Sequence, residues 1–435
     1  MLKKKKKLRV AQRYHHHISH RSLREFSQIM ADSEWKEDKG LKHDLSKYVK
    51  ENLKRGEILD FVKRDYPGYK WSLPTLDRRL RFFEINYIDY KTNLEDVSSA
   101  IAKELDGPGK LLGYRALTQK LRVEHDIKVP RHLVYNMLTT MDPEGVEARC
   151  VQKKKKKKKE KISFTCEGPL AVVSLDGHDK LCGYQNWTFP LGIYGAMDTF
   201  SRKILFIYVC YSNSNPVIIG KRYLEYLYEA QVIPKYLRID RGTETGKMAT
   251  LHVYLINNAG IMDDPVDSVI YGPSTSNKIE RWWRDLHERL EFYFKVQLTQ
   301  LIKENDYDPY NDLDRQLLSY VFIPVVQKEC DKFVNIWNTH RIREQGNVFL
   351  PTGVPNHMFS FPESYGGQNL GIPITSDQLK EVAEVSGLLK VDVSSDNTSE
   401  LVRKECERLI DDPLNLDPNQ AKTAYLFLKE NIPKS

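Results

Sequence analysis

The sequence predicts an α/β domain built on a mixed five-stranded sheet, flanked by helices and preceded by two all-helical units. Three observations carry this prediction. Between residues 41 and 148, apolar residues recur at the three- and four-residue spacing of helices. From Leu170 onward, short runs of β-branched and aromatic residues replace that spacing. After the third such run, expected helices and strands alternate, a pattern typical of a mixed sheet covered by helices.

Charge divides the 435-residue chain into two parts. Residues 1–160 contain 38 Lys and Arg against 23 Asp and Glu, whereas residues 161–435 contain 29 against 36. The first part therefore carries a net charge of +15 and the second a net charge of −7. A basic segment joined to an acidic globular part is typical of a chain that binds a polyanion. The apolar runs are far shorter than the ~20 residues of a membrane span, so no membrane partner is expected.

Two segments, Lys3–Lys7 and Lys153–Lys159, consist of lysine alone. Because like charges repel one another, residues 1–40 are predicted to be a disordered basic arm and residues 151–164 a linker. Either run is a candidate nuclear import signal, which makes the nucleus the expected location; a solubilising spacer is the alternative for each. The six cysteines include no Cys-x-x-Cys pair, so neither a zinc site nor a disulfide framework is expected.

Residues 41–90 are predicted to form a helix-turn-helix unit of three short helices. Gly56 separates the first two apolar segments, and Pro74 suits the first turn of the third helix. The recognition helix of such a unit lies in the major groove of DNA. We therefore expect DNA contacts from the arginines of the third helix, which are Arg78, Arg79 and Arg81.

Residues 95–150 are predicted to form a second helix-turn-helix unit, broken by glycine and proline at residues 107–109. Here Arg115 and Arg131 are the expected DNA contacts. Residues 113–138 resemble the helix-turn-helix segment that precedes the catalytic core in many bacterial transposases. Three-helix groups with surface arginines also occur in proteins that never touch DNA, but two in tandem on the basic side of the chain favour DNA binding.

Residues 165–360 are predicted to form the α/β domain. Its first strand is an apolar run expected to end at Asp176, and its helices are expected to begin at Pro216, near Met248 and near Ser276. The first three strands are expected to form an antiparallel set, with the polar Ser201 and Arg202 between the second and the third. The remaining strands are expected at residues 191–200, 203–211, 236–240 and 269–271.

Three carboxylates are predicted to gather at the ends of this sheet: Asp176, Asp240 and Glu280. Ligands of open α/β sheets collect beyond the strand ends, and carboxylate oxygens suit Mg²⁺ or Mn²⁺. Two such ions, about 3.5–4 Å apart, can activate an attacking oxygen and stabilise a leaving one. Taken singly, each residue has a plainer interpretation, because the aspartates fit turns and Glu280 fits a capping box with Asn277. Asp179 competes with Asp176 for the first position.

The predicted long helix from Ser276 has a buried stripe and a basic side. Trp282 and Trp283 fall on the stripe and are expected in the core. The basic residues Lys278, Arg281 and Arg284 fall largely off the stripe and are expected to contact the DNA backbone. A solvated helix face is the alternative interpretation.

Four motifs in this region arrive in the order of a known family: "DTFSRK", Asp-x-Gly-x-Glu at 240–244, Asn-x-x-Glu-Arg at 277–281 and Asn-x-x-Arg at 338–341. On these motifs, residues 165–360 resemble the integrase core domain shared by retroviral integrases, retrotransposons and many transposases. The resemblance implies a ribonuclease-H-like fold. It also implies that Asp176, Asp240 and Glu280 form the metal-binding DDE triad, while Asp198 of the first motif is not carried over as catalytic. The spacing from Asp240 to Glu280 exceeds the family's usual one.

The resemblance implies a transposon-type integrase or transposase that cuts and joins DNA with two Mg²⁺ or Mn²⁺ ions, and by analogy a homo-oligomer. Two alternatives stay open: a domesticated, catalytically inactive DNA-binding protein derived from a transposable element, and a ribonuclease-H-like nuclease without strand transfer. Arg241, beside the second aspartate, departs from the residues common in the family. Residues 361–435 are predicted to be a helical tail with helices at 376–385, 399–410 and 420–431, to which no function is assigned.

Overall fold

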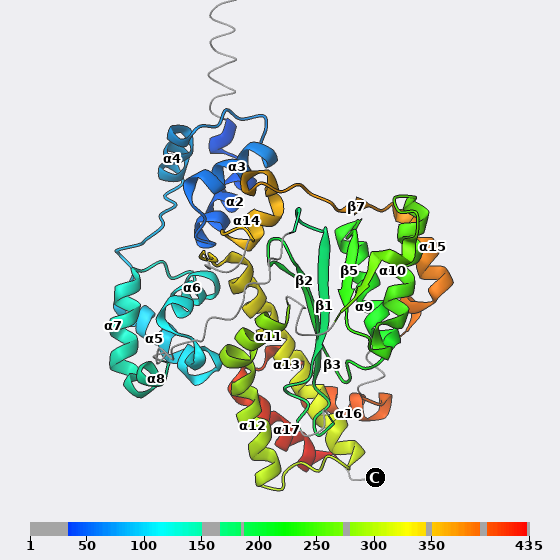
Figure 1. Ribbon diagram of the computed structural model, residues 1–435. Helices are drawn as coiled ribbons and strands as arrows, with labels where there is room; N and C mark the ends of the chain where they lie inside the picture. Colours follow the sequence, from blue (N-terminus) through cyan, green and yellow to red (C-terminus); the bar gives the residue numbers. More distant parts are fainter. Residues whose placement is uncertain are drawn as a thin grey trace, which may run out of the picture. The chain divides into compact units, whose positions relative to one another are not determined.

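The computed structural model describes residues 34–149, 166–183, 187–272, 279–344, 350–391 and 398–432 (Figure 1). The chain divides into two compact units, Met1–Asp89 and Tyr90–Ser435. Both lysine runs and Lys278 lie outside the described residues. Across the described residues, no helix combines the length and the apolar character needed to cross a membrane.

The first unit consists of short helices, and it contains the three that were predicted between residues 41 and 85. Asp38 caps the first of them by accepting a hydrogen bond from the backbone N–H of Leu41 at 2.9 Å. Ser72 and Thr75 form a capping box before the third, in which Pro74 lies in the first turn. The elements are η1 (Glu34–Lys36), α2 (Lys39–Lys50), α3 (Arg55–Asp65) and α4 (Leu73–Phe82).

The second helical group belongs to the same compact unit as the sheet. Its elements are α5 (Leu94–Asp106), η2 (Pro108–Leu111), α6 (Tyr114–Glu124), α7 (Arg131–Met141) and α8 (Pro143–Ala148). A small apolar core holds these helices together, and Val97, Leu117 and Leu121 are fully buried in it. Polar contacts then join the group to the rest of the unit. For example, the Gln119 side chain donates to the Thr339 hydroxyl at 3.3 Å.

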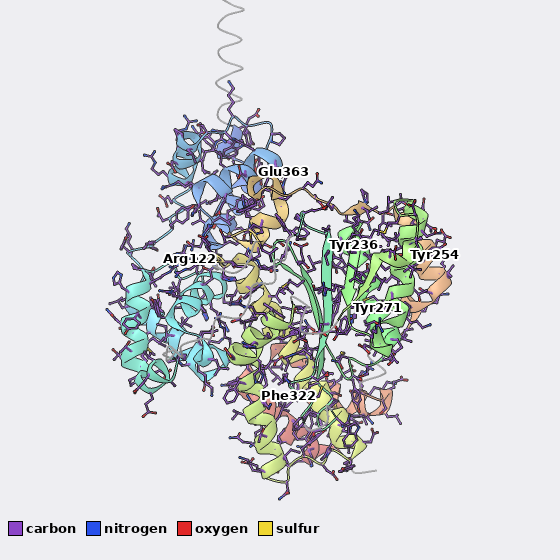
Figure 2. The ribbon with its side chains drawn as sticks, in the orientation of Figure 1. Arg122, Tyr236, Tyr254, Tyr271, Phe322 and Glu363 are labelled. Carbon is purple, nitrogen blue, oxygen red and sulfur yellow. The ribbon has the colours of Figure 1, made fainter. Side chains whose placement is uncertain are left out.

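The sheet has five strands in the order β3-β2-β1-β5-β6, which confirms the predicted mixed α/β topology. The pairs β1–β2 and β2–β3 are antiparallel, whereas β1–β5 and β5–β6 are parallel. The strands are β1 (Val172–His178), β2 (Gly192–Asp198), β3 (Ile204–Cys210), β5 (Tyr236–Ile239) and β6 (Val269–Tyr271). Figure 2 labels Tyr236 and Tyr271 on the two parallel strands β5 and β6.

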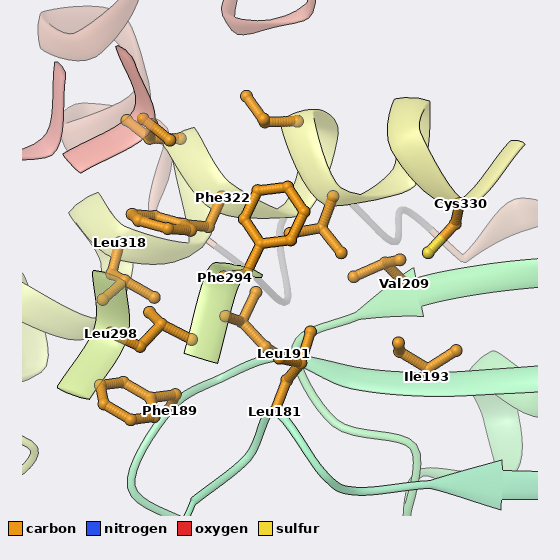
Figure 3. Close-up of a cluster of buried hydrophobic side chains, with 14 of the residues drawn as sticks. Leu181, Phe189, Leu191, Ile193, Val209, Phe294, Leu298, Leu318, Phe322 and Cys330 are labelled. Carbon is orange, nitrogen blue, oxygen red and sulfur yellow. The ribbon is translucent and has the colours of Figure 1, made fainter. Parts of the chain in front are cut away.

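Helices cover both faces of the sheet because its side chains alternate between two apolar clusters. On one face, Leu175 and Tyr194 pack against α9 (Pro216–Ala230) and α10 (Gly246–Ala259). The other face packs against α11 (Ile279–Leu286), the π-helical turn η7 (His287–Glu291), α12 (Phe292–Lys303) and α13 (Asp312–Thr339). Figure 3 shows this second cluster, with Ile193 and Val209 of the sheet facing Phe294 and Phe322 of the helices.

Helix α13 also covers the edge strand β3 with two amide side chains. The Asn338 amide accepts from the Ile204 N–H and donates to the Ile204 carbonyl, both at 2.9 Å. Gln327 accepts from the Val209 N–H at 2.7 Å and donates to the Ile207 carbonyl at 3.1 Å. The two amides thus satisfy backbone groups that an edge strand would leave open. Asn338 of the late Asn-x-x-Arg motif therefore has a structural role.

The C-terminal segment is part of the core of the second unit. Its short strand β7 (Ile372–Pro373) pairs antiparallel with β4 (Val232–Ile233). Helix α15 (Ser376–Ser386) packs against α9. The hydroxyl of Tyr254 on α10, labelled in Figure 2, also donates to Glu381 of α15 at 2.6 Å. Buried residues of the last two helices join the cluster around α13, among them Cys406 and Tyr425. The helices are α14 (Pro355–Ser360), α15 (Ser376–Ser386), α16 (Glu400–Leu409) and α17 (Ala421–Asn431).

Candidate active site

Asp176 and Asp240 lie on neighbouring parallel strands. Asp240 directly follows β5, as the sequence predicts. The prediction that Asp176 ends its strand is wrong, because β1 continues through Gly177 and His178, which still pair with β2. In the parallel register Ser174 pairs with Arg238, and two further residues along each strand bring Asp176 beside Asp240. Adjacent strands lie about 4.8 Å apart, so the two carboxylates are near neighbours.

Glu280 reaches the same place from the first turn of α11. It shares a side-chain hydrogen bond with Asp176. Three residues further along the helix, the indole N–H of Trp283 donates to Asp176 Oδ2 at 3.0 Å. Residues three apart on a helix share a face, so α11 presents both groups to β1. The structure therefore brings together the three carboxylates chosen from the sequence, and we call Asp176, Asp240 and Glu280 the carboxylate cluster.

Burial, together with nearby negative charge at Asp176, sets the electrostatics of the carboxylate cluster. Burial, and then the nearby charge of Glu280, raise the pKa of Asp176 to about 8; the Trp283 hydrogen bond opposes this increase, and Asp240 adds to it. Burial also raises the pKa of Asp240, against the charge of Arg238. Asp240 Oδ1 is buried and has no hydrogen-bond partner among the described residues. Both carboxyl groups therefore favour the protonated form more strongly than they would in water.

The donor set of the carboxylate cluster fits a hard cation. Its oxygens are the ligand type that Mg²⁺ and Mn²⁺ prefer, and Asp240 has a buried oxygen with nothing else to bind among the described residues. In the arrangement described, however, no three Asp, Glu, His or Cys side chains of the described residues are placed to hold an ion together. Glu280 is exposed on the first turn of α11. A shared ion would therefore require the three carboxylates to move closer together.

The raised pKa of Asp176 predicts an unusual effect of pH on stability. The folded chain keeps a proton on Asp176 that the unfolded chain, with the ordinary pKa of 3.8, has lost. The stability contribution of this group therefore falls as the pH rises from about 4 to about 8. Without metal, we expect Asp176→Asn to stabilise the chain at pH 8.5 by a few kcal/mol, because each tenfold change in a protonation equilibrium corresponds to about 1.4 kcal/mol.

Urea unfolding in EDTA at pH 5.5 and pH 8.5 measures this effect. The wild type should lose more stability between the two pH values than Asp176→Asn does. Added Mg²⁺ should reduce the difference in unfolding free energy between the wild type and Asp176→Asn at pH 8.5. Parallel pH dependence in the two proteins would show that Asp176 has an ordinary pKa in the folded chain.

Two other aspartates near the site are engaged in local structure. Asp179 accepts a hydrogen bond from the Asn213 amide just beyond the end of β1. Asp198 is fully buried and accepts from the backbone N–H groups of Leu170 and Ser201 at 2.8 and 2.7 Å. Asp198 thus fastens the β2–β3 turn, which agrees with leaving it out of the triad. The geometry also favours Asp176 over Asp179 as the first carboxylate.

The basic residues around the carboxylate cluster are exposed where the structure describes them. Arg281 and Arg284 are exposed on α11, directly after Glu280. Arg241 is also exposed, next to Asp240. Lys278, the third predicted contact of this helix, lies outside the described residues. The DNA-binding role of these residues stays a prediction.

In the first unit, the three arginines of α4 that were predicted to contact DNA differ in their exposure to solvent. Arg78 and Arg81 are exposed on the helix, as a DNA contact requires. Arg79 is only 3% exposed, and its guanidinium lies 4.0 Å from the ring centroid of Trp71 and 5.1 Å from that of Trp35. Its prediction as a DNA contact is therefore wrong for this fold of the unit. Arg79 lies three residues after the buried Leu76 and so falls on the inner face of the helix.

In the second helical group, Arg115 on α6 and Arg131 on α7 are both exposed. Arg115 donates through Nε to the Tyr114 hydroxyl at 3.0 Å. Arg131 begins α7, the helix that corresponds to the predicted recognition helix. Both side chains are therefore accessible to a partner from solvent.

Sequence reasoning missed the role of Trp283 beside the carboxylates, because it assigned both tryptophans of α11 to the core. Both are in fact 2% exposed, so the core prediction is confirmed. The second role follows from the indole N–H, which needs a partner when buried. The spacing of three residues from Glu280 to Trp283 was the available signal. Gly195 was also missed; it pairs with Asp176, and a Cβ there would lie 3.0 Å from Trp283 Cη2.

The strand order, the helices on both faces and the position of the carboxylates define a ribonuclease-H-like α/β fold. Comparison with family models agrees with this class: residues 164–357 match the integrase core domain. This part of the chain is similar to integrase core domains, and the similarity supports a function of the integrase or transposase type. The comparison with curated proteins gave no match.

Proposed function

We propose that this chain is a transposon-type integrase or transposase that cuts and joins DNA phosphodiesters at the carboxylate cluster. One observation carries the proposal. Inside the region similar to integrase core domains, two strands and one helix bring Asp176, Asp240 and Glu280 together, and a buried oxygen of Asp240 has no partner among the described residues. Buried charge without compensation is costly in a purely structural site. Such a cost is expected where a charged ligand is to be bound.

Asp176, Asp240 and Glu280 are the residues that would hold Mg²⁺ or Mn²⁺. Divalent ions at such a site activate an attacking oxygen and stabilise the oxygen that leaves. The protein's own part is to orient the carboxylates: Trp283 fixes one oxygen of Asp176, and the parallel register fixes the distance from Asp176 to Asp240. Glu280 lies on a helical turn that also carries Arg281, whose charge suits an approaching phosphate.

DNA is the proposed partner. The net charge of +15 over residues 1–160 supplies long-range attraction to the phosphate backbone. Arg78 and Arg81 in the first unit, and Arg115 and Arg131 in the second helical group, are exposed cations for this purpose. Joining two element ends needs two active sites, so we propose a homo-oligomer. The lysine runs support a nuclear location.

The alternative is a domesticated, inactive DNA-binding protein derived from a transposable element. The observation that favours it is the hydrogen bond between Asp176 and Glu280, together with the absence, among the described residues, of three side chains placed to hold an ion. A site of this kind could persist in a chain that no longer binds metal.

Strand-transfer assays separate the two functions. The full chain is incubated with Mn²⁺, supercoiled plasmid and labelled duplexes that carry candidate terminal repeats. The proposed function predicts labelled DNA joined to plasmid, and no joining by Asp240→Asn at equal DNA binding. Equal DNA binding without joining by either protein would support the inactive alternative. Cleavage of RNA–DNA hybrids without joining would instead indicate a nuclease.

A further inference from the structure

A chain of side chains connects the fully buried Glu291 to Asp176 across the interface between α11 and β1. Glu291 Oε2 lies 2.9 Å from His178 Nε2. The His178 ring stacks on the Trp283 ring, with 4.8 Å between centroids and 11° between planes. The Trp283 indole N–H then donates to Asp176 Oδ2 at 3.0 Å. No step of this chain depends on a residue outside the second unit.

The Trp283 ring has little freedom to move. His178 lies against its face, and Trp282 contacts it with 5.0 Å between ring centroids. Gly195 lets the ring lie close to the sheet, because a Cβ at this position would come within 3.0 Å of Cη2. The direction of the indole N–H, and with it the orientation of the Asp176 carboxylate, therefore depends on where the His178 ring is held.

Glu291 holds the His178 ring. It ends the π-helical turn η7, and His287 at the start of the same turn also contacts Glu291 Oε2, at 3.1 Å. Burial acts to raise the pKa of Glu291, but the hydrogen bonds from the two histidines outweigh it and keep the pKa below its usual range. As a carboxylate, Glu291 can only accept, so His178 must present Nε2–H to it. This fixes the tautomer and the plane of the His178 ring.

Burial of this carboxylate is not explained by stability. Glu291 is 0% exposed, and its Oε1 has no hydrogen-bond partner among the described residues. Replacing a buried ion pair with apolar residues of the same volume often leaves the stability of a protein unchanged or increases it. Single π-helical turns inside α-helices occur frequently at functional sites. Here the turn places Glu291 against His178 of β1, two residues beyond Asp176.

We propose that Glu291 is a positioning residue for the carboxylate cluster, acting through His178 and Trp283 to orient Asp176 for a divalent cation. The inference rests on the proposed function for the identity of the ligand. Residues that orient the metal ligands without binding the metal themselves are important for affinity. Their removal typically lowers metal affinity 10- to 100-fold. We expect a loss of about that size, roughly 10- to 100-fold, in Mn²⁺ affinity for Glu291→Gln.

Electron paramagnetic resonance of free Mn²⁺ measures this affinity on the full chain without DNA. The matched control is Glu104→Gln. Glu104 is also buried, and it also accepts from a histidine, His125, at 2.8 Å, but it lies on α5 away from the carboxylate cluster. Both variants remove a buried negative charge. Only Glu291→Gln should weaken Mn²⁺ binding.

Trp283→Phe tests whether Glu291 acts on Asp176 through Trp283. Because this variant leaves every buried charge in place, it also keeps the inference testable if Glu291→Gln does not fold. It removes the N–H donor and should itself weaken Mn²⁺ binding roughly 10- to 100-fold. Combined with Trp283→Phe, the Glu291→Gln change should cause no further loss, because both act through one hydrogen bond.

The outcomes distinguish this inference from the proposed function. Wild-type Mn²⁺ affinity in Glu291→Gln or in Trp283→Phe overturns the inference, whatever the DNA assays give. Weakened Mn²⁺ binding in both, with no DNA joining by the wild type, leaves the inference standing and contradicts the proposed function. A wild-type chain that binds no Mn²⁺ overturns both.

Discussion

Asp176→Asn is expected to lower the rate of Mn²⁺-dependent DNA cleavage by about a thousandfold or more. Coordination by divalent ions is worth several kcal/mol of transition-state stabilisation, and each 1.36 kcal/mol is about tenfold in rate. Asp176 is the most strongly perturbed carboxylate of the cluster and contacts both Glu280 and Trp283. Its replacement should therefore remove most of the activity. The measurement is the initial rate of plasmid nicking, with DNA binding followed separately.

Asp179→Asn is the matched control for this change. Asp179 lies three residues further along, and Asn213 donates a hydrogen bond to it just beyond β1. The variant should keep wild-type nicking to within a few fold. Loss of activity in Asp179→Asn, with activity kept in Asp176→Asn, would reassign the first carboxylate. The stability gain expected for Asp176→Asn at high pH makes misfolding a poor explanation for its loss of activity, because residues of an active site commonly reduce stability.

Lys120→Met is expected to destabilise the second unit by about 3–5 kcal/mol, the usual cost of breaking a buried ion pair from one side. The Lys120 ammonium lies 2.8 Å from Glu104 and 3.6 Å from Glu329, and its side chain is 7% exposed. Without Lys120, each buried carboxylate would keep one cationic partner among the described residues. Glu104 would keep His125, and Glu329 would keep Lys332. Urea unfolding at pH 7 measures the change.

The control for Lys120→Met is Lys103→Met on α5. Lys103 pairs with Asp417 at 4.0 Å with its side chain 66% exposed. Exposed pairs of this kind contribute about 0–1 kcal/mol. Equal destabilisation by the two variants would mean that the buried contacts of Lys120 with Glu104 and Glu329 contribute no more to stability than an exposed ion pair does.

The sequence predicts an element well where local signals and tertiary structure agree. Helix α9 begins at Pro216, as predicted, because Asn215 caps it through the Val217 N–H and Pro216 lies in its first turn. Strand β1 is longer than predicted, because Gly177 and His178 continue the pairing with β2 beyond Asp176. Pairing with a neighbouring strand cannot be seen in a single segment.

Helix α13, the longest of the described helices, was absent from the prediction. It contains Pro324, a residue that usually ends helices. It also buries polar residues such as Glu329 and Asn338 together with its apolar ones, so its pattern lacks a clean polar face. Its amide contacts to β3 come from residues more than 100 positions away in the chain. Only the folded structure brings them together.

The carboxylate cluster could be predicted because the order of the family's motifs identifies its members. Its surroundings could not. The contact of Trp283 with Asp176, the stacking on His178 and the anchor at Glu291 depend on how α11 and η7 lie on β1. For Arg79, in contrast, the sequence did contain a local signal for burial. Arg79 follows the buried Leu76 by three residues, but the prediction grouped it with the neighbouring arginines as a DNA contact.

The central claim is that Asp176, Asp240 and Glu280 bind divalent cations together, and Mn²⁺ located in a crystal of the full chain tests it most directly. The anomalous signal of Mn²⁺ should give density between the Asp176 and Asp240 carboxylates, with Glu280 turned from its hydrogen bond to Asp176 toward the ion. Crystals of Asp240→Asn should lack that density. If Mn²⁺-soaked crystals showed no anomalous density there and kept the Asp176–Glu280 hydrogen bond, the claim would be contradicted.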